Sequence, residues 1–148
     1  MLVNNRWVRA SGNLQDKPIS IQFREDWTQA KESGLYGLCV QIAWNAQTND
    51  DSTGFPATEE QARIIAFTEQ LQARLEPDEN SVVAMMITHD GINQWIIYSK
   101  DLDVLKAGLE TIPTDNGLYP IEVVADEDAE WSTFIQVHER INSELDSQ

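Results

Sequence analysis

The stretch Ser81–Ser99, SVVAMMITHDGINQWIIYS, decides the fold of this chain. Two apolar runs flank Asp90-Gly91, a dipeptide that favours a two-residue β-hairpin turn because it tolerates positive φ at both central positions. With this turn, the predicted pairs are His89–Ile92, Ile87–Gln94, Met85–Ile96 and Val83–Tyr98 on one face, and Thr88–Asn93, Met86–Trp95, Ala84–Ile97 and Val82–Ser99 on the other. Both faces are apolar near the middle, whereas a strand with one wet face alternates polar and apolar residues. We therefore expect this hairpin at the centre of a sheet that is covered on both sides.

The chain is strongly acidic. Its 148 residues include 25 acidic and 10 basic side chains, which gives a formal net charge of −15, and 41% of the residues are hydrophobic. Residues 101–148 alone contain 12 acidic and 2 basic side chains. Length and composition suit one domain with a single core. The charge repels nucleic acids and anionic lipid surfaces, so it disfavours both as partners and favours a basic protein.

Cysteine usage and hydropathy indicate a cytoplasmic location. Cys39 is the only cysteine, which excludes an intramolecular disulfide and a CxxC metal pair. The first ten residues, MLVNNRWVRA, lack the apolar core of a signal peptide. No apolar run approaches the roughly 20 residues that a membrane-spanning helix needs. We expect Cys39 to be a small buried hydrophobe.

Periodicity predicts the elements before the hairpin. Short strands are expected over residues 6–10 and 17–24, joined by a polar turn, followed by a loop or short helical turn over 25–34. A strand over residues 35–45 places Leu38, Val40, Ile42 and Trp44 on one face and Cys39, Gln41 and Ala43 on the other. Thr58 is a good N-cap for the first helix, and Gln61 completes a capping box. The helix has the apolar stripe Ile64, Phe67, Leu71 and Leu75 and ends at Pro77.

After the hairpin, Asp101 is expected to cap a second helix, which ends at Pro113. Its apolar stripe consists of Leu102, Leu105, Leu109 and Ile112. A last strand is expected over residues 119–125, followed by the acidic run Asp126–Glu130 and a third helix. The apolar face of that helix consists of Trp131, Phe134, Ile135, His138, Ile141 and Leu145.

These elements predict one α+β domain over residues 1–148. From residue 35 the order is βαββαβ, typical of a ferredoxin-like (split βαβ) antiparallel sheet. Residues 1–34 add an N-terminal hairpin, 35–125 form the core, and 126–148 form the acidic loop and C-terminal helix. Two helices cover one face of the sheet, and the other face needs a cover, because an exposed apolar sheet is a sticky patch. We expect the C-terminal helix there, with the N-terminal hairpin or a second subunit as alternatives, so a monomer and a homodimer both remain open.

Three passages resemble a known family. They are the Gly54-Phe55-Pro56 loop with Thr58, Glu59 and Glu60, the hairpin THDGINQWIIYSKD over 88–101, and YPIEV followed by DEDAEW over 119–131. From about residue 35 onward the chain resembles bacterial domain-of-unknown-function family 695. Where that family usually has Asp-Pro-Glu-Trp, this chain has Asp128-Ala129-Glu130-Trp131. The resemblance implies an α+β fold and identifies no catalytic residue. The family is similar to the small, acidic ribonuclease E inhibitors, which implies a regulatory binding role.

One loop has the spacing of a calcium site. Asn49, Asp51, Thr53, Gly54 and Glu60 match positions 1, 3, 5, 6 and 12 of an EF-hand-like loop, where oxygen ligands are needed. Asn at position 1, Pro56 and a strand in place of the entering helix weaken the match. His89 and His138 are the only imidazoles, and neither has a second His or Cys at ligand spacing. We therefore expect no cofactor.

Catalytic patterns are weak. The chain has no GxSxG motif, and its paired carboxylates, such as Asp50-Asp51, lie in polar segments where acids stay solvated. One alternative is a metal-assisted hydrolase, which requires Asp50, Asp51, His89 and Asp90 to converge. A second alternative is a small-ligand-binding domain with a pocket between the sheet and the C-terminal helix.

The main functional hypothesis is therefore a non-catalytic domain that binds and regulates another protein. Five tryptophans are many for this length, and Trp44 and Trp95 fit buried strand positions. Trp131 lies beside an acidic run, Asp126, Glu127, Asp128 and Glu130. A tryptophan anchor with an acidic rim suits a basic protein partner.

Overall fold

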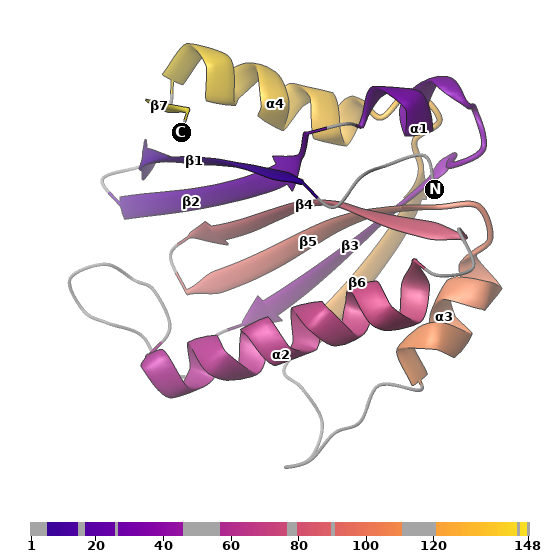
Figure 1. The fold of residues 1–148 in the computed structure, drawn as a ribbon, viewed down its shortest axis with the longest axis horizontal. Coiled ribbons are helices and arrows are strands. Elements are labelled where there is room, and N and C mark those ends of the chain that lie inside the picture. The colour runs from indigo at the N-terminus through magenta and orange to yellow at the C-terminus, as the bar shows by residue number, and fades with distance from the viewer. Residues whose placement is uncertain are drawn as a thin grey trace.

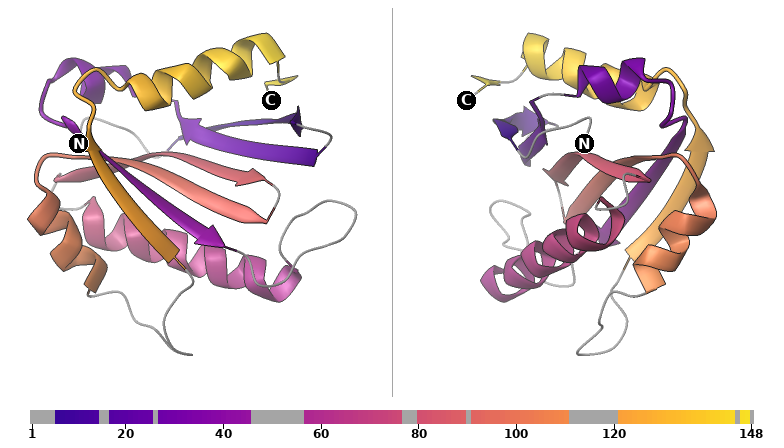
Figure 2. Two further views of the ribbon diagram at one scale, coloured as in Figure 1. Left: turned by 180° about the vertical axis from the view of Figure 1, so that it is seen from behind. Right: turned by 45° about the vertical axis from the view of Figure 1, so that its right-hand side comes forward.

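An antiparallel sheet of seven strands, the last of only two residues, runs through the structure with helices on both faces (Figures 1 and 2). This computed structural model describes residues 6–14, 17–25, 27–45, 57–76, 80–89, 91–110, 121–144 and 146–147. The strands are β1 (Trp7–Leu14), β2 (Lys17–Arg24), β3 (Leu38–Asn45), β4 (Ser81–His89), β5 (Ile92–Ser99), β6 (Ile121–Glu127) and β7 (Asp146–Ser147). The helices are α1 (Thr28–Glu32), α2 (Thr58–Leu75), α3 (Leu102–Glu110) and α4 (Ser132–Glu144). The chain is thus an α+β domain, as predicted.

The β4–β5 hairpin lies in the middle of the sheet, as its two apolar faces indicated. The strand order is β6-β3-β5-β4-β2-β1-β7, so β5 and β4 each have a neighbour on both sides. Gly91 has φ +81°, as the hairpin turn requires. The predicted register holds from His89–Ile92 to Met85–Ile96.

Beyond Met85 the predicted pairing is wrong, because β4 contains a bulge between Val83 and Met85. The observed pairs are Val83–Ile97, Val82–Tyr98 and Ser81–Ser99, in place of Ala84–Ile97, Val83–Tyr98 and Val82–Ser99. Two side chains from outside β4 form hydrogen bonds with the main chain at the bulge. The N–H of Val83 donates to Glu76 Oε2 at 2.9 Å, and Arg24 Nε donates to the Val83 carbonyl oxygen at 3.1 Å.

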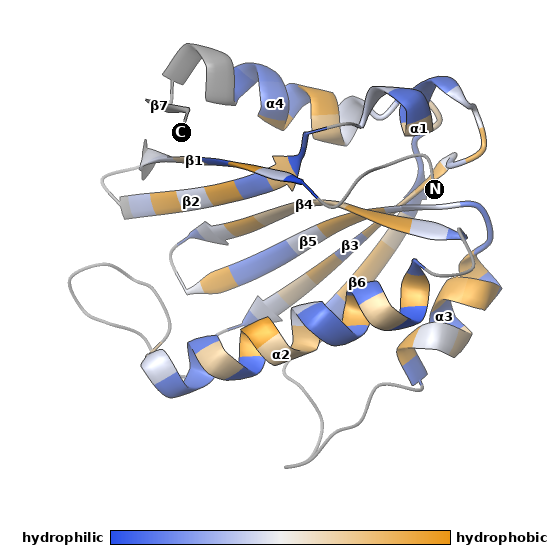
Figure 3. Ribbon diagram, viewed as in Figure 1, coloured by the Kyte–Doolittle hydropathy of each residue, from blue (hydrophilic) through white to orange (hydrophobic). Residues whose placement is uncertain are grey.

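The α2 face of the sheet holds one of two core layers. The predicted stripe of α2 is buried there against Val40, Ile42, Trp44, Val83, Trp95 and Ile97 of the sheet and Leu105 of α3. Figure 3 shows the alternation of apolar and polar residues along α2 that this packing requires. The predicted capping box is wrong. Ala57 is the N-cap, with extended backbone and no side-chain cap, and Thr58 is already the first helical residue.

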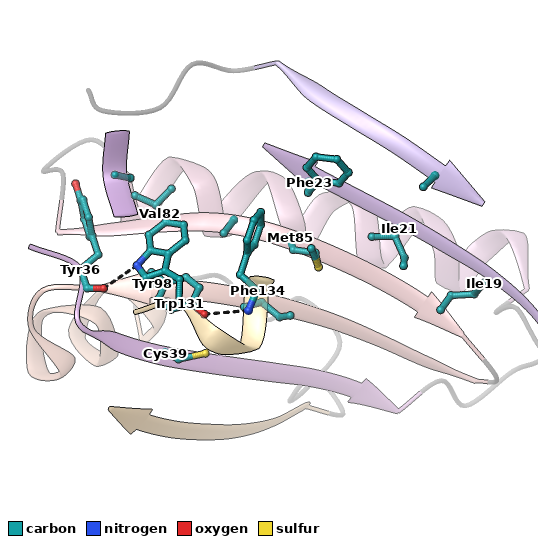
Figure 4. Packing of buried hydrophobic residues seen from close by; sticks show 14 residues of the cluster. Ile19, Ile21, Phe23, Tyr36, Cys39, Val82, Met85, Tyr98, Trp131 and Phe134 are labelled. Atoms are coloured by element: carbon teal, nitrogen blue, oxygen red, sulfur yellow. Dashed lines mark hydrogen bonds between the residues drawn. The ribbon is translucent and has the colours of Figure 1, made fainter. Parts of the chain in front are cut away.

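The C-terminal helix α4 covers the other face, as predicted. Its Phe134 packs with Trp131, Tyr98 and Phe23 in the second core layer (Figure 4). Cys39 belongs to this layer and is buried, as expected of a small hydrophobe. The short helix α1 lies on the same face, where Ala30 is fully buried.

Two boundaries differ from the sequence prediction. β1 continues through Ser11–Leu14, and it pairs with β2 from Trp7–Arg24 to Leu14–Lys17, so the expected turn over residues 11–16 is mostly strand. Serine, glycine and asparagine are tolerated there because β1 lies near the edge of the sheet. β6 includes Asp126 and Glu127, which were expected in a loop. An exposed edge strand accepts such charges.

The second helix has the predicted cap. Asp101 Oδ1 accepts hydrogen bonds from the N–H groups of Asp103 (2.8 Å) and Val104 (3.2 Å) at the start of α3. The expected end of this helix at Ile112 and Pro113, and the turn after it, lie outside the described residues. Within the described residues, no helix has both the length and the apolar character to cross a membrane.

Candidate functional site

The candidate site is the strand β6, which forms one margin of the sheet (Figure 2). Its register with β3 is continuous from Ile121–Trp44 to Glu127–Leu38. Every residue from Glu122 to Glu127 is exposed, including Val123 (43%) and Val124 (56%). Valine side chains exposed in sequence on an edge strand are typical of a surface that contacts another chain.

The outer side of β6 presents main-chain hydrogen-bonding groups. The Asp128 N–H donates to the Gly37 carbonyl oxygen at 2.9 Å, in register with the β3–β6 ladder. Because alternate residues of an antiparallel strand bond to the same neighbour, Glu127, Ala125 and Val123 direct their N–H and C=O groups away from β3. This edge therefore offers the pattern that an added strand needs.

The side chains along this edge are acidic. Glu122, Asp126, Glu127 and Glu130 are all exposed. The ten residues from Ile121 to Glu130 contain no lysine or arginine. Three of the predicted contact residues, Asp126, Glu127 and Glu130, thus lie at the surface as expected of a rim.

Asp128, the fourth acidic residue of the prediction, is half-buried and caps α4. Its Oδ1 accepts the Ser132 N–H at 2.8 Å, and its Oδ2 accepts the Thr133 N–H at 3.0 Å and the Tyr98 hydroxyl at 2.9 Å. Burial acts to raise the pKa of Asp128, but the hydrogen bonds from Thr133, Ser132 and Tyr98 outweigh it and lower the pKa below its usual value. Its main role is to hold the start of α4.

Trp131 is not an exposed anchor, which corrects the sequence prediction. Its side chain is 1% exposed and stacks on Tyr98, with ring centroids 4.0 Å apart. Its indole N–H donates to the Tyr36 carbonyl oxygen at 3.0 Å (Figure 4). Trp131 has φ +59°, in the left-handed region, because a tight turn from Asp128 directs the ring inward. The Trp131 N–H closes that turn on the Asp128 carbonyl oxygen at 3.0 Å, although Ala129 replaces the proline usual in the family.

The hydroxyl of Tyr98 joins the sheet to α4. It donates to Asp128 and accepts the N–H of Phe134 at 3.2 Å. Burial, followed by the neighbouring Cys39 and Asp128, raises the pKa of Tyr98 well above its usual value. Burial also raises the pKa of the Cys39 thiol, which keeps it protonated and unreactive as a nucleophile. These groups form a structural network.

The proposed calcium loop falls largely outside the described residues. This applies to Asn49, Asp51 and Thr53. Glu60, its fourth ligand, is buried and accepts a hydrogen bond from the Trp44 indole N–H at 2.8 Å. Among the residues that the structure describes, no group of three or more His, Cys, Asp or Glu side chains could hold a metal ion.

The hydrolase alternative depends on the same part of the chain. Asp50, Asp51 and Asp90 lie outside the described residues, and His89 is half-buried at the end of β4. His138 packs against Phe23, Trp27 and Phe134, with ring centroids 5.0–5.9 Å apart, so it lies at the edge of the core.

Sequence reasoning missed the contribution of Glu122, Val123 and Val124 to the exposed surface. The sequence predicted a strand over residues 119–125 but did not indicate whether Val123 and Val124 would be buried. Only the strand order, which places β6 at the margin, makes these side chains accessible. The one available signal was the density of acidic residues around the pair, which is unusual for an inner strand.

Comparisons with known proteins give one finding. The comparison with curated proteins and the comparison with solved structures found no significant match. A family model, described as a family of unknown function (DUF695), matches residues 5–137. This match covers both core layers and the acidic edge, and on this ground the chain belongs to the DUF695 family.

Proposed function

We propose that this domain binds a basic, extended segment of another protein along β6 and thereby regulates that protein. The observation that carries the proposal is the outer edge of β6, with which no other described strand pairs. Glu122–Glu127 is exposed throughout, with main-chain groups directed outward at Val123, Ala125 and Glu127. In strand addition, main-chain hydrogen bonds supply affinity, and alternate side chains supply specificity.

The charge of the edge selects the partner. Glu122, Asp126, Glu127 and Glu130 surround the two exposed valines, and the chain as a whole carries −15. Lysine and arginine side chains of an added strand would meet these carboxylates, and the negative field would accelerate their encounter. A second copy of β6 is disfavoured, because two acidic strands placed side by side repel.

The wider setting of the proposal has three parts. The order β6-β3-β5-β4, with α2 and α3 on one face, favours a ferredoxin-like split βαβ core. A buried free cysteine suits a cytoplasmic protein. The expected resemblance of the family to acidic ribonuclease E inhibitors is the ground on which we propose a regulatory role and a non-catalytic mechanism.

A peptide-binding measurement tests the proposal. The probe is a fluorescent peptide of alternating lysine and valine, and its anisotropy is followed as the full chain is added. We expect saturable binding that weakens as salt rises, because exposed charges are screened beyond about 10 Å at 0.1 M. A peptide of alternating glutamate and valine is the charge control and should not bind.

Two proline variants localise the contact. Ala125→Pro removes an outward N–H of β6 and leaves the bonds to β3 intact, since proline is tolerated on the open side of an edge strand. Ala129→Pro, in the exposed turn two residues beyond β6, is the matched control. Ala125→Pro should abolish binding and Ala129→Pro should preserve it. Equal binding by both variants, or salt-independent binding, would contradict the proposal.

A further inference from the structure

A groove lies between α2 and the strands β2, β4 and β5, on the side of the sheet away from β6. It has a volume of about 350 Å³, within the range of small-molecule sites, and is open to solvent. Its floor comes from β2, β4 and β5, and one wall comes from α2. Gln61, Ile64, Ile65 and Thr68 form that wall, because their spacing places them on one side of the helix.

The floor contains a row of hydrogen-bonding side chains. Ser20 pairs with Thr88, and Thr88 pairs with Asn93, so these three residues lie side by side across three strands on one face. In the next row, Gln22 pairs with Met86. Adjacent strands are about 4.8 Å apart, so the polar side chains of this row are close enough together for one small ligand to hydrogen-bond with several of them.

Asn93 directs part of its amide toward this groove. Asn93 is only 6% exposed and lines the groove with its remaining surface. One end of its amide is bonded to the Thr88 hydroxyl, with Oγ1 and Oδ1 2.6 Å apart. The other end forms no hydrogen bond with any residue that the structure describes. No buried side-chain nitrogen or oxygen among the described residues lacks a hydrogen-bond partner, so this end of the amide is accessible to solvent and can donate to a ligand in the groove.

Gln22 provides a second available amide. Its side chain is half-buried and makes no hydrogen bond within the described part of the chain. A carboxamide presents a donor next to an acceptor, and it pairs with a planar edge that carries the complementary groups, as asparagine and glutamine do with adenine. Ile64 and Ile65 on the helix and Met86 on the floor supply aliphatic surfaces for the faces of such a ring.

The charge of the groove excludes anionic ligands. Among its described lining residues, Glu69 is the only ionisable side chain, and none is basic. A phosphate or carboxylate in the ligand would meet only negative charge, from Glu69 and from the chain as a whole. A neutral ligand with polar edges and apolar faces fits this lining.

We propose that the groove between α2 and strands β2, β4 and β5 binds a nucleobase or nucleoside that carries no phosphate. Asn93 and Gln22 hydrogen-bond the edge of the base, and Ser20 contacts its polar substituents. Ile64, Ile65 and Met86 contact the ring. This site is separate from the β6 edge, so each proposal can fail without the other.

The test is an NMR titration of the full chain with adenosine, guanosine, cytidine and uridine. The Trp95 indole N–H is the reporter, because it donates to Thr68 Oγ1 in the wall of the groove at 3.0 Å. The Trp131 indole N–H, in the other core layer, is the internal control. We expect at least one nucleoside to shift the Trp95 signal in a saturable way and to leave the Trp131 signal in place.

Variants and analogues define the chemistry. Ile65→Trp fills the groove from its rim and should abolish the shift, whereas Ala66→Trp, on the exposed side of α2, should not. Gln22→Leu should weaken binding about tenfold, the loss expected for one amide–base pair. Adenosine monophosphate should bind at least about tenfold more weakly than adenosine, because like charges disfavour binding.

Three results would overturn the proposal. One is the absence of any Trp95 shift at about 10 mM nucleoside, where even millimolar affinity saturates. Another is an equal shift with ribose alone, which would show that the base is not recognised. The third is unchanged binding in Ile65→Trp, which would place the ligand elsewhere.

Discussion

Replacing Glu76 with alanine should be among the most destabilising substitutions in this chain. Arg24 is 1% exposed, and its Nη2 lies 2.6 Å from Glu76 Oε1 and 2.5 Å from Oε2. The guanidinium carbon also lies 4.4 Å from the centre of the Trp7 ring. Glu76→Ala removes the carboxylate that pairs with this buried cation and also removes the acceptor of the Val83 N–H.

The magnitude follows from these contacts. Removing one partner of a buried ion pair costs about 3–5 kcal/mol, because the other charge stays buried without compensation. The orphaned Val83 N–H is part of that cost, since an unsatisfied buried donor costs about 1–3 kcal/mol. At about 2–4 °C per kcal/mol for a chain of this size, the melting temperature should fall by roughly 6–20 °C.

Urea unfolding followed by tryptophan fluorescence measures this loss. The matched control is the exposed pair Arg6–Glu25, whose N–O distance is 3.9 Å and whose side chains are 75% and 53% exposed. Glu25→Ala should cost less than about 1 kcal/mol, as exposed pairs do. The double variant Arg24→Met with Glu76→Leu should be less destabilised than Glu76→Ala, because it leaves no buried charge.

Two results would refute this reasoning. If Glu76→Ala costs no more than Glu25→Ala, the Arg24–Glu76 pair does not hold β2 and α2 to the bulge of β4. If the double variant loses as much stability as the single variants Arg24→Met and Glu76→Leu together, the two side chains act independently, and the cost is not that of an unpaired charge.

Three further predictions concern the core and the cap of α4. Asp128→Asn should make the free energy of unfolding less dependent on pH in the acid range. The pKa of Asp128 is lowered in the folded state, so its carboxylate stabilises the fold above the pKa of the unfolded state, and this contribution is lost as pH falls below about 5. Urea unfolding at several pH values would detect the difference. Trp131→Phe should lower the free energy of unfolding by about 2–3 kcal/mol, because it removes the hydrogen bond to Tyr36 and leaves a smaller ring in the core. The folded variant should bind the lysine–valine peptide normally, because Trp131 is buried. Weaker binding would mean that Trp131 is an anchor for the partner after all. Gly108→Ala should lower the free energy of unfolding by about 1 kcal/mol, although alanine has the higher helix propensity. The new Cβ would lie 2.8 Å from Leu75 Cδ2 and 3.3 Å from the Arg74 carbonyl oxygen. A variant that thermal denaturation shows to be stabilised would contradict this packing.

Local chemistry made much of the fold predictable. Asp90-Gly91 set the turn and five pairs of the hairpin, and Asp101 marked the start of α3. The spacing of apolar residues in α2 identified the buried side of that helix. The two apolar faces of the hairpin indicated that helices must lie on both sides of the sheet, and α4 provides the second cover.

The errors come from contacts between distant parts of the chain. The bulge of β4 depends on Arg24, which is 59 positions from Val83 in the sequence, and no pattern within β4 signals it. Acidic neighbours suggested that Trp131 was exposed, but its burial depends on a left-handed backbone and on the face of Tyr98. Val123 and Val124 resemble core residues until the strand order places β6 at the edge. Local patterns identify elements, but accessibility depends on the neighbours that the topology supplies.

The same topology keeps the two proposed sites apart. Only β3 lies between β6 and β5, which is the floor strand nearest to β6 and contributes Asn93 to the groove. The outer edge of β6 is therefore about 10 Å from the nearest floor strand and about 19 Å from β2, at about 4.8 Å per strand. The intervening strand β3 carries core side chains on both faces, so neither site can shift the other without disturbing a packed layer. We therefore expect Ile65→Trp to change the free energy of peptide binding, and Ala125→Pro to change the free energy of nucleoside binding, by less than about 0.5 kcal/mol each. A larger coupling would mean that the ligand regulates the protein contact through the sheet.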